Sequence, residues 1–239
     1  MENQKREPAE TTEQFQIEGG RLVKCTQEYG TIRVPYGVTE IGEGAFEGVK
    51  SRLIMLPETV EIIGERAFSR CEYLMTVVFP SSLKTIGKGA FENCYILYLA
   101  DLSKTGVEVI PDDAFRNSGL NFIHFPSGLR EIGESAFEDC EELQELILPG
   151  QVTRVGNSAF TGCKNLARVV IPNSIQELEY DAFAFYAHNP DYMLLPKSYE
   201  PTEDEDISSF AFGYDYMYVD NEIHFYDETP DWDEVYGVM

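Results

Sequence analysis

The chain has 239 residues, and its 42 Asp and Glu against 18 Lys and Arg give a formal net charge of -24 at pH 7. Such an acidic chain repels phosphate backbones and anionic lipid, which argues against binding to nucleic acid or to a membrane surface. No apolar stretch is long enough to span a membrane, and the polar first residues do not resemble a signal peptide. We therefore expect a cytoplasmic protein, or a cell-surface or secreted one whose export signal has been removed.

The first 37 residues divide into two parts. Residues 1–14 are polar and charged, and we expect them to form a disordered lead-in. Short apolar runs then flank Gly19-Gly20, which predicts a strand hairpin within residues 15–37. This hairpin would be an N-terminal β cap, because a stack of repeats needs its first open edge covered.

An Ala-Phe pair recurs along the middle of the chain. Between Phe46 and Phe183 the phenylalanines follow one another at intervals of 22, 23, 24, 22, 23 and 23 residues. A fixed period in this range is the signature of a solenoid, in which each repeat forms one coil. We therefore predict a curved, elongated repeat solenoid of about seven repeats over residues 38–196, built mainly from short parallel β-strands with short helical turns.

Each repeat contains a strand that stops at a proline. Examples are residues 74–79 before Pro80 and residues 143–148 before Pro149. The side chains one and three places before the proline are apolar and should line the core, whereas those two and four places before it should face outward. Like positions in successive strands should form ladders along the solenoid.

The segment around each Ala-Phe pair predicts a turn. A glycine such as Gly64 or Gly87 precedes the pair in five repeats, where we expect the chain to turn sharply. Phe68 and Cys71 lie three residues apart, a spacing that places both on one face of a short helical turn.

Four of the five cysteines, Cys71, Cys94, Cys140 and Cys163, occupy this same position of the repeat, three residues after the Phe. A repeated position favours a packing role, so we interpret them as small buried side chains that stay reduced. Cys25 stands outside the pattern, and the sequence contains no C-x-x-C pair typical of zinc or redox sites.

The repeat unit Ile-Gly-x-x-Ala-Phe-x-x-Cys-x-x-Leu-x-x-Val-x-Ile-Pro resembles that of the BspA-like leucine-rich repeat family, which is found largely in bacteria. The resemblance extends over about residues 15–196 and includes a cap-like segment at 15–23. It implies a solenoid of leucine-rich-repeat type and a non-catalytic adhesion or protein-interaction module, often at the cell surface. One repeat, at 97–111, departs from the pattern because it lacks the strand-ending proline.

The period is lost after Pro196. Residues 197–239 form an acidic, aromatic segment, which holds 13 Asp and Glu between 198 and 239 and no Lys or Arg. Alternating tyrosines at 214–218, a turn signal at 220–221 and the apolar run 223–226 are compatible with a hairpin. We interpret the segment as a C-terminal cap or tail.

No motif for catalysis, a cofactor or a metal is visible. The histidines His124, His188 and His224 lie in different segments and lack metal-ligand spacing. Motifs of nucleophilic hydrolases, nucleotide-binding loops and zinc hydrolases are missing from the sequence. The acidic run 203–206 lacks the glycine and ligand spacing of a calcium-binding loop. We predict that the chain is not an enzyme and needs no cofactor.

The outward strand positions suggest a binding face, because contiguous exposed apolar surface often marks interaction sites. Alternatively, β-branched residues at these positions only favour strand formation, and a flanking segment covers them. One outward ladder is predicted to run from Met55 through Asp101 to Leu194, and the adjoining ladder from Leu53 through Leu99 to Tyr192. The candidate partner-binding residues are Met55, Val78, Leu99, Phe122, His124, Ile147 and Val170.

Two functions of different classes remain open. In the first, the chain is a monomeric interaction module whose sheet face binds a protein, with the acidic end steering a basic surface toward it. In the second, residues 200–239 act as a charge mimic that inhibits a basic or nucleic-acid-binding protein. Deletion of that segment would separate the two.

Overall fold

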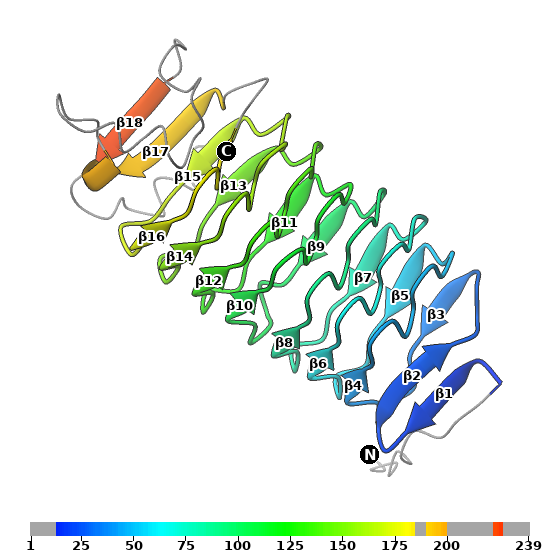
Figure 1. Ribbon diagram of the computed structural model, residues 1–239. Helices are drawn as coiled ribbons and strands as arrows, with labels where there is room; N and C mark the ends of the chain where they lie inside the picture. Colours follow the sequence, from blue (N-terminus) through cyan, green and yellow to red (C-terminus); the bar gives the residue numbers. More distant parts are fainter. Residues whose placement is uncertain (1–12, 185–189, 200–221, 227–239) are drawn as a thin grey trace, which may run out of the picture.

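The computed structural model describes residues 13–184, 190–199 and 222–226 of the chain. These residues form an elongated stack of coils, in which each repeat makes one turn and lies against the next (Figure 1). Within the described residues the sole helix is the short 3-10 helix η1 (Lys197–Tyr199). The predicted fold class, a solenoid of short parallel strands, is confirmed.

One long side of the stack is built from the predicted proline-ended strands. Their parallel pairing keeps like positions in register, so that Thr31, Leu53, Thr76, Leu99 and Phe122 form one continuous row. A five-stranded sheet in the order β11-β9-β7-β5-β3 is followed along the stack by a four-stranded sheet in the order β13-β15-β17-β18. The strands are β3 (Thr31–Arg33), β5 (Leu53–Met55), β7 (Thr76–Val78), β9 (Leu99–Asp101), β11 (Phe122–His124), β13 (Glu145–Ile147), β15 (Arg168–Val170), β17 (Tyr192–Pro196) and β18 (Glu222–Tyr226).

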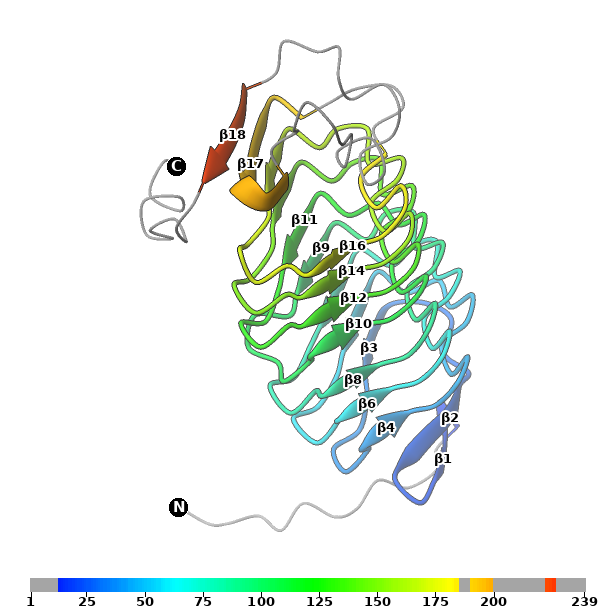
Figure 2. The same ribbon diagram turned by 60° about the vertical axis from the view of Figure 1, so that its left-hand side comes forward.

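A second side carries shorter, two-residue strands (Figure 2). A turn separates the proline from each of these strands. In this turn the backbone N–H of the third residue after the proline donates to the proline carbonyl, as Leu83 does to Pro80 at 3.1 Å. The two sheets on this side have the orders β1-β2-β4-β6-β8 and β10-β12-β14-β16. The short strands are β4 (Glu40–Ile41), β6 (Ile62–Ile63), β8 (Thr85–Ile86), β10 (Val109–Ile110), β12 (Glu131–Ile132), β14 (Arg154–Val155) and β16 (Glu177–Leu178).

The N-terminal end carries the hairpin expected from the Gly-Gly turn. Strands β1 (Phe15–Glu18) and β2 (Arg21–Cys25) pair in antiparallel fashion, and both Gly19 and Gly20 adopt positive φ. The hairpin extends the sheet of two-residue strands through the β2–β4 pair. The division of the chain into cap, solenoid and tail stays a prediction, and residues 1–12 of the expected lead-in lie outside the described residues.

The Ala-Phe segments form the third side, and they are not the helical turns that the spacing predicted. In the coils of Phe46 to Phe160, the residue just before the Ala and the residue two after the Phe adopt positive φ, as Ser135 does at 52° and Asp139 at 58°. This left-handed backbone interrupts any helix. Instead, the Phe N–H donates to the Ala carbonyl of the next coil, for example Phe137 to Ala159 at 2.8 Å. The third side is therefore a hydrogen-bonded stack of turns.

The glycines before these turns have a different role from the one predicted. Gly64 and Gly87 do not have positive φ, so they are not required by the sharpness of a turn. A Cβ on Gly87 would lie 2.5 Å from the backbone N of Glu65 and from the backbone C of Gly64. Glycine is needed because successive coils approach each other too closely there for any side chain.

A column of phenylalanines forms the centre of the core. All seven rings are fully buried and stacked nearly parallel, with centroids 4.9–5.3 Å apart and interplanar angles of 2–9°. Cys25 ends the column at the cap, because its N–H donates to the Ala45 carbonyl as the phenylalanine N–H groups do in later coils. The members of the column are Phe46, Phe68, Phe91, Phe115, Phe137, Phe160 and Phe183.

Candidate functional site

The outward ladders predicted from the sequence exist, but their exposure changes along the stack. On β5 to β11, Val78 is 45% exposed and the His124 side chain 59%, while Met55, Leu99 and Phe122 are half-buried. Pairing brings Met55 beside Val78 and Leu99 beside Phe122. Five of the seven candidate residues therefore share one accessible sheet face, which we call the β5–β11 face and define as the outward residues 53, 55, 76, 78, 99, 101, 122 and 124.

The other two candidates lie beyond this face. Ile147 on β13 is half-buried, and Val170 on β15 is fully buried. The predicted exposure of Val170 is therefore wrong, and so is that of Leu194, which is 8% exposed. At this end of the stack the Tyr226 hydroxyl of β18 donates to the carbonyl of Ile171, next to Val170, at 2.6 Å.

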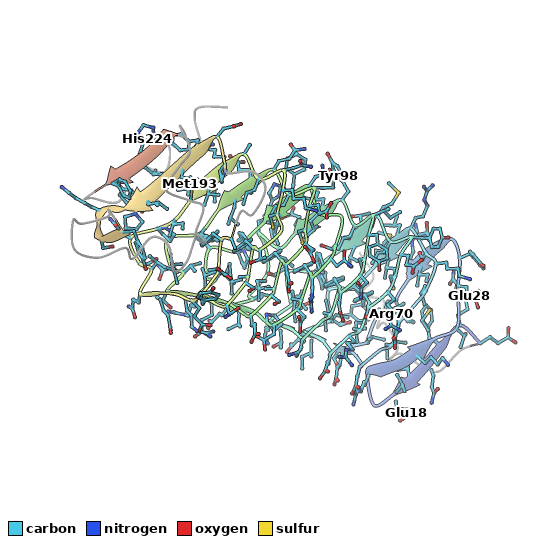
Figure 3. All side chains as sticks on the ribbon, turned by 45° about the horizontal axis from the view of Figure 1, so that its top comes forward. Glu18, Glu28, Arg70, Tyr98, Met193 and His224 are labelled. Carbon is cyan, nitrogen blue, oxygen red and sulfur yellow. The ribbon has the colours of Figure 1, made fainter. Side chains whose placement is uncertain are left out.

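A group of exposed aromatic and apolar side chains borders the β5–β11 face and was not singled out in the sequence. The rings of Tyr73, Tyr95 and Tyr98 are 49–52% exposed, and Met75 and Ile96 are 41% and 40% exposed. We call these five residues the tyrosine patch. They lie in the segments that lead into β7 and β9, and the Tyr98 N–H donates to the Met75 carbonyl of the preceding coil at 3.0 Å. Tyr98 projects from the molecule in Figure 3.

The tyrosine patch joins the face through one aromatic contact. The Tyr98 ring meets the Phe122 ring edge-on, with centroids 5.7 Å apart and an interplanar angle of 72°. The patch and the face therefore form one continuous surface. The sequence contained a signal, since three tyrosines fall within residues 73–98. The predicted alternation covered only the strand residues and not the segments before them.

The outward side of the two-residue strands differs in character. Its outward residues are Glu40, Ile62 and Thr85 in the first sheet and Val109, Glu131, Arg154 and Glu177 in the second. Ion pairs between coils involve these residues, such as Arg154 with Glu177 at 3.5 Å and Arg21 with Glu40 at 3.1 Å. Ile62 and Val109 are exposed, but they belong to different sheets. Among the described residues, the extended apolar surface therefore lies on the side of the proline-ended strands.

His124 faces Asp101 across neighbouring strands, with its Nδ1 3.6 Å from Oδ1 of the carboxylate. The same Asp101 oxygen accepts hydrogen bonds from the Ser103 hydroxyl at 2.7 Å and the Ser103 N–H at 3.1 Å. These bonds, with a smaller contribution from His124, lower the pKa of Asp101 below its ordinary value. The carboxylate lies between the serine and the histidine, so His124 is not placed to take a proton from the Ser103 hydroxyl.

The cysteines are buried and free, as the packing interpretation predicts. Each repeat cysteine donates its thiol to the Phe carbonyl of the preceding coil's turn, as Cys71 does to Phe46 at 2.9 Å. Ser118 fills this position in the fourth coil and is also buried. Burial raises the pKa of Cys71 to about 12 and that of Cys140 to about 11, which disfavours the reactive thiolate.

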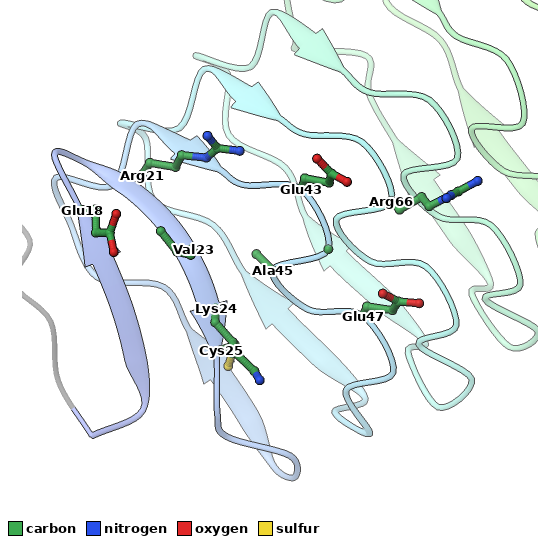
Figure 4. A pocket seen from close by; sticks show the side chains of 10 residues that line it. Glu18, Arg21, Val23, Lys24, Cys25, Glu43, Ala45, Glu47 and Arg66 are labelled. Carbon is green, nitrogen blue, oxygen red and sulfur yellow. The ribbon is translucent and has the colours of Figure 1, made fainter.

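A cleft of about 660 Å³ lies between the cap hairpin and the first coils (Figure 4). It is lined by carboxylates and cations in equal number, several of them already engaged, as Glu47 is with Arg70 at 3.9 Å. Within the described ranges, no group of three or more His, Cys, Asp or Glu side chains is placed to hold a metal ion. The charged lining residues of the cleft are Glu18, Arg21, Lys24, Glu43, Glu47 and Arg66.

Most of the acidic C-terminal segment lies outside the described residues, including the run 203–206 and nearly all of the charge-mimic candidate 200–239. His188 lies outside them as well. Strand β18 belongs to the part of the acidic C-terminal segment that is described, and it pairs in parallel with β17. His224 of β18 packs against Tyr192 of β17 with ring centroids 5.2 Å apart. Among the described residues there is no helix with the length and apolar character to cross a membrane.

Comparison with known proteins agrees with this architecture. The family described as "BspA type Leucine rich repeat region" matches residues 21–105 and 101–212, with six copies of its repeat. No curated protein matches the sequence.

Two solved structures of bacterial repeat proteins are similar in fold. The leucine-rich repeat protein of T. pallidum is 22% identical, with a TM-score of 0.50 over 87% of this chain and 91% of that one. A leucine-rich repeat protein from Eubacterium ventriosum is 21% identical, with a TM-score of 0.50 over 70% of this chain and 54% of that one. At this identity the likeness concerns the fold alone.

Proposed function

Because the chain belongs to the BspA-type leucine-rich repeat family, we propose that it is a non-catalytic module that binds a protein partner through the β5–β11 face. One observation carries the proposal: a contiguous, partly exposed apolar surface on one sheet, next to exposed tyrosines, in a chain that is strongly acidic. Apolar surface of this kind marks interaction sites, and tyrosine is enriched where binding energy concentrates.

The charge of the face supports a protein rather than a nucleic acid as partner. Of its eight outward residues Asp101 is the sole one that is Asp, Glu, Lys or Arg, whereas the whole chain carries a formal charge of -24. An apolar face on a chain of this net charge fits a partner with an apolar contact and a basic rim, because charge then steers the encounter while the apolar area holds the complex. Adhesion at a cell surface is one setting for such binding, and the solenoid alone is a sufficient binding unit.

The test compares two double variants of the full chain that carry the same substitutions on opposite sides of the stack. Val78→Asp with Phe122→Asp places charge on the β5–β11 face, and Ile62→Asp with Val109→Asp places it on the second sheet. All four parent side chains are exposed or half-buried, so both variants should fold, as checked by circular dichroism and urea unfolding.

The immobilised chain captures partners from lysate of its source, and the captured protein is then titrated against each variant. We expect the first variant to lose affinity by about 30-fold or more, since buried hot spots contribute about 2 kcal/mol or more each. The second variant should bind as the parent does. Equal binding by both variants would rule out the face.

A further inference from the structure

The tyrosine patch has exposed rings, and among the described residues none of these rings has a cation over its face. In the part of the chain that the structure describes, Tyr29 and Tyr192 each have a basic side chain over the ring. The Lys50 Nζ lies 5.5 Å from the Tyr29 centroid, and the Arg168 guanidinium lies 5.7 Å from the Tyr192 centroid. Tyr98 has only the edge of Phe122 as a ring contact among the described residues.

The arrangement around Arg168 shows what such a ring can hold on this side of the stack. Arg168 lies between two neighbours in the same ladder: its Nη1 is 2.8 Å from Glu145 Oε1, and its guanidinium lies over the ring of Tyr192. A guanidinium binds well in such a place, because it pairs with a carboxylate while its plane stacks on an aromatic face. The solenoid thus contains its own example of an arginine held between a carboxylate and a tyrosine.

The earlier coils also offer a tyrosine ring and a carboxylate, placed three residues apart along one coil and not on neighbouring strands as around Arg168. Tyr98 leads into β9, and Asp101 ends that strand on the outward side. The lowered pKa of Asp101 keeps its carboxylate ionised at neutral pH. Glu72 is exposed beside Tyr73 in the preceding coil. Lys50 and Arg52 border the patch toward the N-terminus, so the favourable region for a cation is the end near Tyr95 and Tyr98.

We propose that the tyrosine patch binds an arginine side chain of the protein partner, which stacks on an exposed tyrosine ring and pairs with Asp101 or Glu72. The inference rests on the proposed function and names the chemistry of the partner: an extended, arginine-bearing segment that lies across the coils at β7 and β9. The net charge of -24 favours the approach of such a segment.

The experiment titrates the full chain with a fluorescent 12-residue peptide of alternating arginine and serine, and with the same peptide carrying citrulline in place of arginine. Citrulline keeps the shape of the side chain and removes its charge. The variants are Tyr98→Leu, which keeps an apolar side chain without a ring, and Tyr98→Phe, which keeps the ring. Tyr36→Leu is the matched control, because Tyr36 is 43% exposed at the other end of the strands.

We expect the arginine peptide to bind the parent chain, and Tyr98→Leu to weaken binding by about five-fold, within the range for a cation–π contact. Tyr98→Phe and Tyr36→Leu should bind within about two-fold of the parent, and the citrulline peptide about ten-fold more weakly. No binding of the arginine peptide at about 1 mM, equal binding of the citrulline peptide, or an unchanged Tyr98→Leu affinity would each overturn the inference.

The same titration separates this inference from the proposed function. If Tyr98→Leu leaves binding of the arginine peptide unchanged while the captured partner still loses affinity for the Val78→Asp with Phe122→Asp variant, the face binds protein but the tyrosine patch does not select arginine. If Tyr98→Leu leaves peptide binding unchanged and the captured partner binds the Val78→Asp with Phe122→Asp variant as tightly as the parent, both proposals fail.

Discussion

Replacing Phe137 with alanine should show how the solenoid is held together. Phe137 is fully buried, stacks on Phe115 at 5.3 Å and on Phe160 at 5.1 Å, and receives the Phe125 ring edge-on at 5.9 Å. Truncation removes these contacts and leaves a cavity that a rigid stack cannot close, so we expect a loss of about 3–5 kcal/mol in the free energy of unfolding. Phe137→Leu, which keeps most of the volume, should cost about 1.5 kcal/mol or less.

The assay for this variant combines urea unfolding with hydrogen exchange followed by mass spectrometry. Because each coil contacts only its neighbours, exchange should accelerate most in the coils of Phe115, Phe137 and Phe160, and least near the cap. A cost below about 1 kcal/mol, or acceleration spread evenly over all coils, would refute the view that the phenylalanine column carries the core.

Three further predictions concern the backbone and the thiols. Gly87→Ala should lower the free energy of unfolding in urea by more than about 2 kcal/mol, because its Cβ would overlap the previous coil. Gly128→Ala should be neutral, because its Cβ would meet nothing within 4 Å. Similar costs for the two variants would contradict the close-approach role. Gly48→Ala should lose about 1 kcal/mol although its Cβ also has open space, because Gly48 has a φ of 69°, and an unchanged midpoint would argue against that strain. Stability should fall above pH 9, because the unfolded thiols ionise near their ordinary value of 9.0 while folded Cys71 and Cys140 keep their protons to about pH 12 and 11. Between these pKa values each thiol contributes a slope of about 1.4 kcal/mol per pH unit to the free energy of unfolding. Cys140→Ser, which places a serine where Ser118 already stands in the previous coil, should make the fall shallower. A fall of equal slope would contradict the role of the Cys140 thiol.

The period of the Ala-Phe pairs was sufficient to predict the coil, the strands and their inward positions. Each of these depends on contacts between like positions of neighbouring repeats, which a repeating sequence displays directly. Val77, Ile123 and Leu146 are buried as the alternation requires, and the cysteines pack as their shared position indicates.

What the sequence did not show depends on contacts across the repeat pattern. The turns were predicted to be helical because Phe68 and Cys71 are three residues apart. In the structure, residues with left-handed backbone such as Arg66 and Arg70 interrupt the helix, and Phe68 and Cys71 are both buried without it. Val170 follows the outward pattern but is buried where the C-terminal strands end the stack. The burial of Val170 arises at the end of the stack, where the repeat stops, and the left-handed turns arise from a backbone conformation that a three-residue spacing does not distinguish from a helical turn.

The measurement that tests the central claim most directly is a footprint of the bound partner. Oxidative footprinting of the full chain, with and without the captured partner, reports the exposure of aromatic and sulfur-containing side chains. The account predicts protection of Tyr73, Met75, Tyr95 and Tyr98 together with Phe122, and unchanged labelling of Tyr36 and Tyr180, which are 43% and 37% exposed away from the patch. Protection confined to residues outside the tyrosine patch and the β5–β11 face would contradict it.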